Sequence, residues 1–163
     1  MTKYIITDPC YILSDEVWQS ICNQCHDDDF YNGKFDNLCT YELNKLAGTT
    51  NAIASATGYG DWSNTINGSN RDKILQSDFF ADSGMVCVVE YNHKVIEALE
   101  ANKNVNLIQE KVGGAALLDL VEPVEISVDT SDKSWTVIYL KDKDGDGFSS
   151  IEQDEEEEED WDE

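Results

Sequence analysis

Three aspartates near the end of the chain could bind a cation. Asp142, Asp144 and Asp146 occupy alternate positions, and Gly147 follows directly. Carboxylate oxygens are the ligands that calcium prefers, and glycine allows the sharp turn that brings such ligands together. The spacing therefore makes these residues candidate calcium ligands. The alternative interpretation is a solvated Asp/Gly turn that leads into the acidic end of the chain.

The segment 142–153 resembles the calcium-binding loop of EF-hand proteins. In that loop, carboxylates stand at positions one, three and five, and a glycine stands at six, as in this segment. The resemblance implies that Phe148 supplies a backbone carbonyl at position seven and that Ser150 binds through water at position nine. The implied metal-binding residues are Asp142, Asp144, Asp146, Phe148, Ser150 and Gln153.

The segment departs from the EF-hand pattern in several respects. Position twelve is Gln153 instead of the bidentate glutamate, and position eight is Ser149 instead of an aliphatic residue. The preceding segment reads as a strand, where the family has a helix, and the chain contains no second copy of the loop. Loss of a bidentate ligand lowers affinity, so any calcium bound here is expected to be held weakly.

Cys22 and Cys25 have the Cys-x-x-Cys spacing of a zinc site, which Cys39, Cys10 or His26 would complete. The pair lies on the apolar stripe of a predicted helix, and the chain has no second Cys-x-x-Cys. Buried cysteines ordinarily behave as small apolar residues. Zinc at Cys22 and Cys25 is therefore disfavoured.

Sequence motifs for catalysis are missing. The chain has no glycine-rich phosphate-binding loop, no nucleophile elbow and no zinc-protease motif. His26 and His93 are the only histidines that could act as general bases. We expect a protein that is not an enzyme, with an unrecognised carboxylate active site as a third hypothesis.

The chain is strongly acidic. Its 163 residues include 34 Asp and Glu against 11 Lys and Arg, a formal net charge of −23. Such a surface repels nucleic acids and anionic membranes and attracts basic proteins. We expect a basic protein partner and neither nucleic acid nor membrane, while the oligomeric state stays open. Because no apolar stretch reaches the length of a signal peptide or membrane span, the expected location is cytoplasmic.

Residues 154–163 form a polyacidic tail that contains one aromatic residue, Trp161. Self-repulsion and the scarcity of apolar residues predict disorder. The tail would serve either as a decoy for a basic groove or as a solubilising segment, and the sequence leaves both open.

Apolar patterning predicts the elements of the first part of the chain. A short strand is expected at 4–6, followed by a helix over 15–26 that Ser14 caps. Residues 27–37 read as a polar loop. The pattern at 38–46 fits a helix and a strand equally.

In the middle of the chain, Asn67-Gly68 is a strong signal for a tight hairpin. The apolar run 85–89 predicts a central strand, and 93–103 predicts a helix with one apolar face. Residues 115–120 are expected to form a short helix or a strand.

The final pattern alternates apolar and polar residues over 124–128 and 135–140, which predicts a hairpin. The sum is an α+β fold: a compact single domain with antiparallel strands and two or three helices. The predicted organisation is a globular domain over 1–141, the EF-hand-like acidic loop over 142–153 and the disordered tail over 154–163.

Several short motifs stand out along the chain: Ile6-Thr7-Asp8-Pro9-Cys10-Tyr11, Trp18 with Cys22, Thr57-Gly58-Tyr59-Gly60-Asp61, Asp82-Ser83-Gly84 before Val86-Cys87-Val88-Val89, and the acidic end. Together they resemble an uncharacterised family of small acidic proteins of phages and prophages. The resemblance implies a compact α+β fold and a phage origin, which would make the location the host cytoplasm. It also implies structural roles for Asp8, as the cap of a turn, and for Cys10 and Tyr11, as packing residues.

Two functional hypotheses lead from this sequence. The first is a non-enzymatic acidic binding protein, a phage-encoded modulator that engages a basic site on a host protein. The second is a calcium-binding module that uses the segment 142–153.

Overall fold

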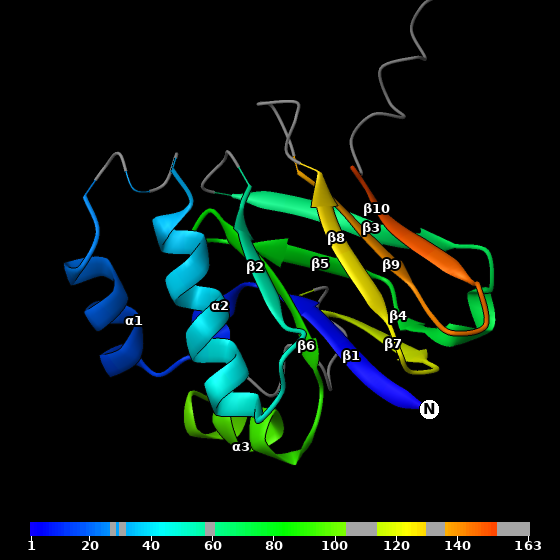
Figure 1. The fold of residues 1–163 in the computed structure, drawn as a ribbon, viewed down its shortest axis with the longest axis horizontal. Helices are drawn as coiled ribbons and strands as arrows, with labels where there is room; N and C mark the ends of the chain where they lie inside the picture. Colours follow the sequence, from blue (N-terminus) through cyan, green and yellow to red (C-terminus); the bar gives the residue numbers. More distant parts are fainter. Residues whose placement is uncertain (27–28, 30–31, 58–60, 104–113, 130–135, 153–163) are drawn as a thin grey trace, which may run out of the picture.

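Three α-helices and two antiparallel sheets of five strands each make up the part of the chain that the computed structural model describes (Figure 1). That part comprises residues 1–26, 29, 32–57, 61–103, 114–129 and 136–152. The α+β class, the antiparallel strands and the number of helices expected from the sequence are confirmed.

The first sheet lies at the centre of the molecule. Strands β1 and β6 pair antiparallel, with Ile5 opposite Val89, and β7 flanks β1 on its other side. This confirms the central strand predicted at 85–89 and decides that 115–120 is a strand. The order is β2 (Ile53–Ala56), β6 (Met85–Glu90), β1 (Thr2–Thr7), β7 (Ala116–Leu120) and β4 (Ile74–Gln76).

The second sheet contains the predicted final hairpin, in which Ser127 pairs with Tyr139. The hairpin is confirmed, although residues 130–135 between its strands lie outside the described part. The order is β5 (Asp78–Ala81), β3 (Trp62–Gly68), β10 (Gly147–Glu152), β9 (Val137–Lys141) and β8 (Glu125–Asp129).

The helices form the third layer. Helix α1 (Asp15–Asn23) begins at Ser14, whose hydroxyl accepts a hydrogen bond from the Val17 amide, as the sequence predicted. Helix α2 (Lys34–Ala47) settles the ambiguous segment 38–46 and shortens the expected loop 27–37. Helix α3 (His93–Ala101) agrees with the predicted helix.

Two apolar cores hold the three layers together. Ile5 and Val89 of the first sheet contribute to a core with the helices, whereas Ile6 and Val88 contribute to a core with the second sheet. Successive side chains of a strand point to opposite faces. The uninterrupted apolar run of β6 therefore reflects a strand that is covered on both faces.

The hairpin predicted at Asn67-Gly68 is wrong. Gly68 ends β3 and pairs with Phe148 of β10, and the chain then crosses to the first sheet through the 3-10 turn η3 (Arg71–Lys73). The glycine has a packing role instead, because a Cβ at Gly68 would lie 2.1 Å from Cδ1 of Phe148.

The folded body extends beyond residue 141, where the sequence placed its end. Strand β10 lies between β3 and β9, and Phe148 is buried in the core between the sheets. Residues 142–152 of the predicted loop therefore form a short turn followed by a strand. The predicted tail, 154–163, lies outside the described residues.

Helices of the described part are all too short or too polar to cross a membrane.

Candidate cation site

The turn between β9 and β10 is folded around the side chain of Asp142. Its Oδ1 accepts hydrogen bonds from the amides of Asp144, at 3.1 Å, and Asp146, at 3.2 Å. The Asp142 amide donates to the Asp146 carbonyl at 3.1 Å, and Gly145 adopts a φ of 88° that favours glycine. The alternating aspartates thus form a tight turn whose first residue bonds to the backbone of the third and fifth.

The turn brings the three predicted carboxylates together. One oxygen from each of Asp142, Asp144 and Asp146 lies within 4.8 Å of the others. The Asp142 side chain is fully buried, that of Asp146 is 26% exposed and that of Asp144 is 55% exposed. This cluster could hold a metal ion, and within the described residues no other group of three or more His, Cys, Asp and Glu side chains is so close together.

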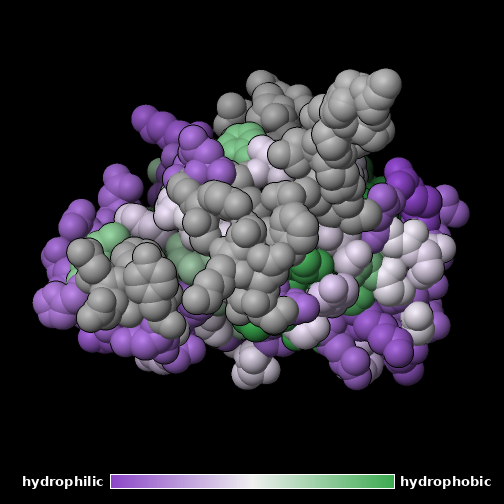
Figure 2. Space-filling model, turned by 90° about the horizontal axis from the view of Figure 1, so that it is seen from above, coloured by the Kyte–Doolittle hydropathy of each residue, from purple (hydrophilic) through white to green (hydrophobic). Residues whose placement is uncertain are grey.

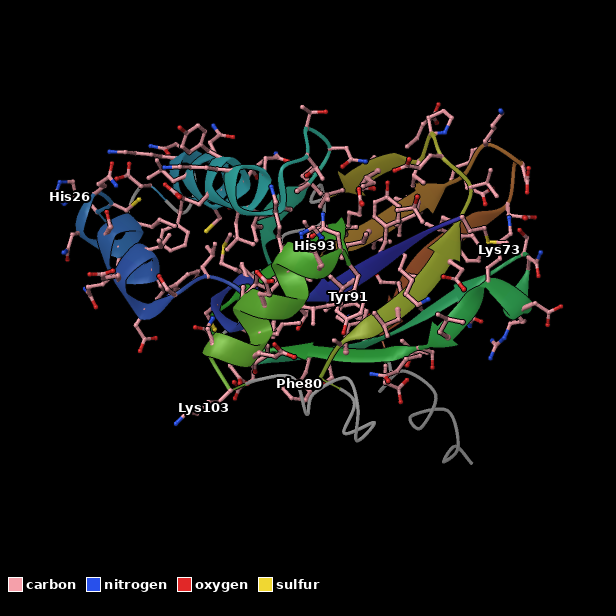
Figure 3. The ribbon with its side chains drawn as sticks, turned by 90° about the horizontal axis from the view of Figure 1, so that it is seen from below. His26, Lys73, Phe80, Tyr91, His93 and Lys103 are labelled. Carbon is pink, nitrogen blue, oxygen red and sulfur yellow. The ribbon has the colours of Figure 1, made fainter. Side chains whose placement is uncertain are left out.

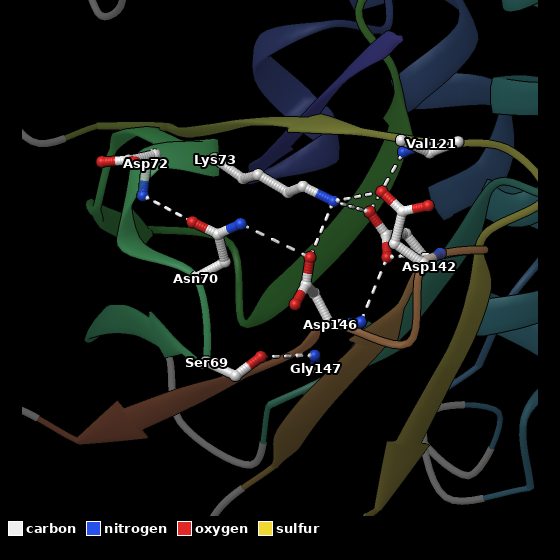
Figure 4. A network of polar contacts seen from close by, with 9 residues as sticks. Ser69, Asn70, Asp72, Lys73, Val121, Asp142, Asp146 and Gly147 are labelled. Atoms are coloured by element: carbon white, nitrogen blue, oxygen red, sulfur yellow. Dashed lines mark hydrogen bonds and ion pairs between the residues drawn. The ribbon is translucent and has the colours of Figure 1, made fainter.

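The Lys73 ammonium lies among these carboxylates (Figure 4). Its Nζ is 2.5 Å from Oδ2 of Asp142, 2.8 Å from Oδ2 of Asp146 and 3.2 Å from Oδ2 of Asp144. The lysine side chain is 8% exposed. A charge this deeply buried is tolerated only where it is paired, and these carboxylates provide the pairing.

Lys73 reaches the cluster because of the turn η3. Asn70 caps this turn by accepting a hydrogen bond from the Asp72 amide at 3.1 Å, and its own amide group lies 3.5 Å from Oδ2 of Asp146. Ser69 then binds Gly147 twice, through its amide and its hydroxyl. These contacts fix the start of η3 against the start of β10 (Figure 4).

Asp142 also binds the connection that follows β7. Its Oδ2 accepts a hydrogen bond from the Val121 amide at 3.1 Å, and the Lys143 amide donates to the Val121 carbonyl at 2.9 Å. The network therefore joins three segments: the turn after β9, the turn η3 before β4, and the end of β7. The turn η3 and the segment after β7 each link a strand of one sheet to a strand of the other.

The charges in this network stabilise each other. Hydrogen bonds to Asp142 and then to Asp146 raise the pKa of Lys73 above its usual range, against the effect of burial. Burial alone would raise the pKa of Asp142, but the hydrogen bonds from Lys73 and from the Val121 amide outweigh it and hold that pKa below its usual value. Both groups thus stay ionised at neutral pH.

The side chains of Phe148 and Ser150, two other residues of the EF-hand resemblance, have contacts within the folded body. The Phe148 side chain is 3% exposed and packs between the sheets. The hydroxyl of Ser150 accepts a hydrogen bond from the Ile138 amide at 3.0 Å, within the second sheet. Gln153 lies outside the described residues.

The cysteines and histidines lie apart from this site. Cys22 and Cys25 pack against the helix-side core, as the predicted stripe implied. His26 follows α1 and His93 begins α3, both well separated from Lys73 (Figure 3). Burial raises the pKa of every thiol, so none has the character of a reactive thiolate. The thiols are those of Cys10, Cys22, Cys25, Cys39 and Cys87.

A second buried carboxylate, that of Asp8, is bound by hydrogen-bond donors only. Its oxygens accept from the amides of Cys10, at 2.9 Å, Asp82, at 2.7 Å, and Ser83, at 2.7 Å, and from the Ser83 hydroxyl at 2.8 Å. Asp8 caps the 3-10 turn η1 (Pro9–Tyr11) and ties it to the turn before β6. The turn-capping role implied for Asp8 is therefore present.

Lys73 is the residue that the sequence interpretation missed. It stands in the polar run Arg71-Asp72-Lys73, and no local pattern distinguishes it from a surface lysine. The available signal was indirect, since a buried acidic turn requires a cation from elsewhere in the chain.

Comparisons with protein-family models, curated proteins and solved structures found no match for this chain.

Proposed function

We propose that this protein is a non-enzymatic binding protein whose acidic surface engages a basic site on another protein. The observation that carries the proposal is the distribution of charge. The chain has 34 acidic and 11 basic residues, and one of those bases, Lys73, is enclosed within the structure. The surface therefore has still fewer bases to offset its carboxylates, which favours a basic partner.

Carboxylates on the helical layer support this proposal. Asp15 and Glu16 on α1 and Glu97 and Glu100 on α3 are exposed, and none has an ion pair with another described residue. The face seen in Figure 2 is hydrophilic over most of its coloured area, with only small apolar patches. Exposed charges without internal partners are available to an external one.

The resemblance to small phage and prophage proteins suggests where such a partner would be found. A phage-encoded modulator acts on a host protein. A host protein that binds nucleic acid has a basic groove, and an acidic protein can bind in such a groove. The tail 154–163 would add carboxylates to the same contact.

The test is affinity capture from an extract of the cells that carry the gene, followed by titration with the purified captured protein. We expect a basic partner whose dissociation constant increases steeply between low and high salt. Replacing 154–163 by a neutral Ser/Gly tail of equal length should weaken binding. A partner that binds equally at all salt concentrations, with or without the acidic tail, would contradict the proposal.

Charge reversal can locate the contact. Asp15→Lys with Glu16→Lys changes α1, and Glu97→Lys with Glu100→Lys makes the same change on α3. The control is Asp61→Lys with Glu125→Lys, which makes the same change of net charge at exposed positions outside the helices. If the helical layer is the contact, at least one of the helical pairs should weaken binding more than this control does.

A calcium-responsive module is the second candidate function. The three carboxylates within 4.8 Å of one another favour it. Against it, the Lys73 ammonium lies among them, and the Ser150 hydroxyl is bound to the Ile138 amide. A calcium titration of the wild-type protein separates the two candidates.

A further inference from the structure

The Lys73 ammonium lies where the three carboxylates converge. All three distances from Nζ to a carboxylate oxygen are between 2.5 and 3.2 Å. A lysine ammonium has three N–H donors, and the network offers one acceptor from each aspartate. The number of donors and the number of carboxylates are therefore matched.

A calcium ion bound by the three aspartates would have to complete its coordination with water. Calcium is ordinarily bound by six to eight oxygens. Both oxygens of Asp142 already accept hydrogen bonds from backbone amides, those of Asp144, Asp146 and Val121. The ion would also have to share the space with a lysine side chain that is only 8% exposed.

The ammonium also has a structural role that a surface lysine lacks. Lys73 immediately precedes β4 of the first sheet, whereas Asp142 immediately follows β9 of the second. Their ion pair therefore joins the two sheets (Figure 4), and Lys73 lies at one end of the molecule (Figure 3). Loss of the ammonium would leave a buried carboxylate, that of Asp142, without its counter-charge.

We propose that the Lys73 ammonium is the resident cation of this aspartate turn, so that the wild-type turn closes without calcium and accepts a divalent cation only when the ammonium is removed. The same alternating carboxylates that would bind a metal here bind a lysine from a distant segment. The role of Lys73 and the proposed basic partner are independent, so either can be wrong while the other holds.

The experiment compares wild type and Lys73→Met by thermal unfolding and by calorimetric titration with calcium chloride. In the wild type, the melting temperature should be the same in EDTA and in about 5 mM calcium, and the titration should show no saturable heat. Lys73→Met should melt at a lower temperature in EDTA. Calcium should raise its melting temperature by several degrees, because a ligand that binds only the folded state stabilises it.

Two further variants make the comparison specific. Lys143→Met removes the same charge from the exposed lysine within the turn, and it should behave like the wild type. Asp144→Ala added to Lys73→Met should abolish the response to calcium. If Lys73→Met does not fold in either buffer, Lys73→Gln takes its place, because glutamine keeps hydrogen-bond donors without the charge.

Two results would overturn the inference. One is saturable calcium binding by the wild type that Asp144→Ala abolishes, because the lysine would then not close the turn. The other is a folded Lys73→Met or Lys73→Gln variant with no response to calcium, because the ammonium would then not mark a cation position.

Discussion

Nζ of Lys73 lies 2.5 Å from Oδ2 of Asp142, although the two residues are separated by 69 positions in the sequence. The pair is the most deeply buried ion pair among the described residues, with side chains 8% and 0% exposed. It joins the turn before β4 to the turn after β9, and thereby the two sheets. The acidic turn is therefore a part of the folded body, with its own counter-charge.

Acid should weaken the network through Asp142. The pKa of this carboxyl is lower in the folded protein than its ordinary value of 3.8, so its contribution to stability is complete above that value. The contribution is lost as the pH falls from 3.8 through the folded value. Melting temperatures measured from pH 7 to pH 2.5 should show this loss in the wild type.

Asp142→Asn is the variant that isolates this effect. It should melt several degrees below the wild type at pH 7, because it removes the carboxylate that Lys73 requires. Its melting temperature should fall less than that of the wild type on acidification. Parallel curves for the two proteins would show that Asp142 does not carry the acid dependence.

Gly68→Ala should destabilise the packing between the sheets. The added Cβ would lie 2.1 Å from Cδ1 of Phe148 and 2.7 Å from the Gly147 carbonyl oxygen, so the ring and the strand would have to move. Overpacking of this kind costs about 1–3 kcal/mol in free energy of unfolding, measurable by urea denaturation. Gly147→Ala is the matched control, because a Cβ there meets nothing within 4 Å. Equal stabilities for the two variants would refute this account of Gly68.

Tyr4 should ionise at a higher pH than an ordinary tyrosine. Burial is the largest cause that raises its pKa to about 12, from an ordinary value of 10.0. The folded state thus holds its phenol proton more tightly than the unfolded state, and this contribution to stability is complete below pH 10 and is lost as the pH rises toward 12. The difference between the ultraviolet pH titrations of the wild type and of Tyr4→Phe should show one tyrosine that ionises well above pH 10. A difference spectrum that titrates near pH 10 would contradict this.

Asp8→Ala should destabilise the protein by about 3 kcal/mol or more, because it removes the acceptor of three backbone amides and one hydroxyl in a buried position. Asp8→Asn keeps one acceptor oxygen and should lose less. Chemical denaturation measures both effects, and Asp61→Ala at an exposed position is the control. A loss for Asp8→Ala no larger than that control would rule out this role.

Local patterns predicted most elements of the fold because those elements carry their own signals. Ser14 and the stripe that follows it specified α1, and the run 85–89 specified a buried strand. At Asn67-Gly68 the local signal failed. The glycine is needed for contact with Phe148, a residue from the far end of the chain, and no local rule reveals such a contact.

Only the local part of the candidate site could be predicted from the sequence, for the same reason. Alternating carboxylates at Asp142, Asp144 and Asp146 indicate a cation and a turn, and the structure has the turn. The identity of the cation depends on a long-range contact made by Lys73, which the sequence does not mark. The end of the folded body was misplaced because an acidic turn resembles the start of an acidic tail, although β10 follows it.

Nuclear magnetic resonance of the lysine ammonium groups tests the central claim most directly. In the full-length wild type at neutral pH, the Lys73 ammonium should give a signal protected from exchange with water, because its three donors are bound and its side chain is buried. Assignment is made by its absence from Lys73→Met, with Lys143→Met as the control. The account predicts that this signal keeps its position and intensity when calcium is added to about 5 mM. A signal that shifts or disappears with calcium would show that the metal displaces the ammonium, and would contradict the account.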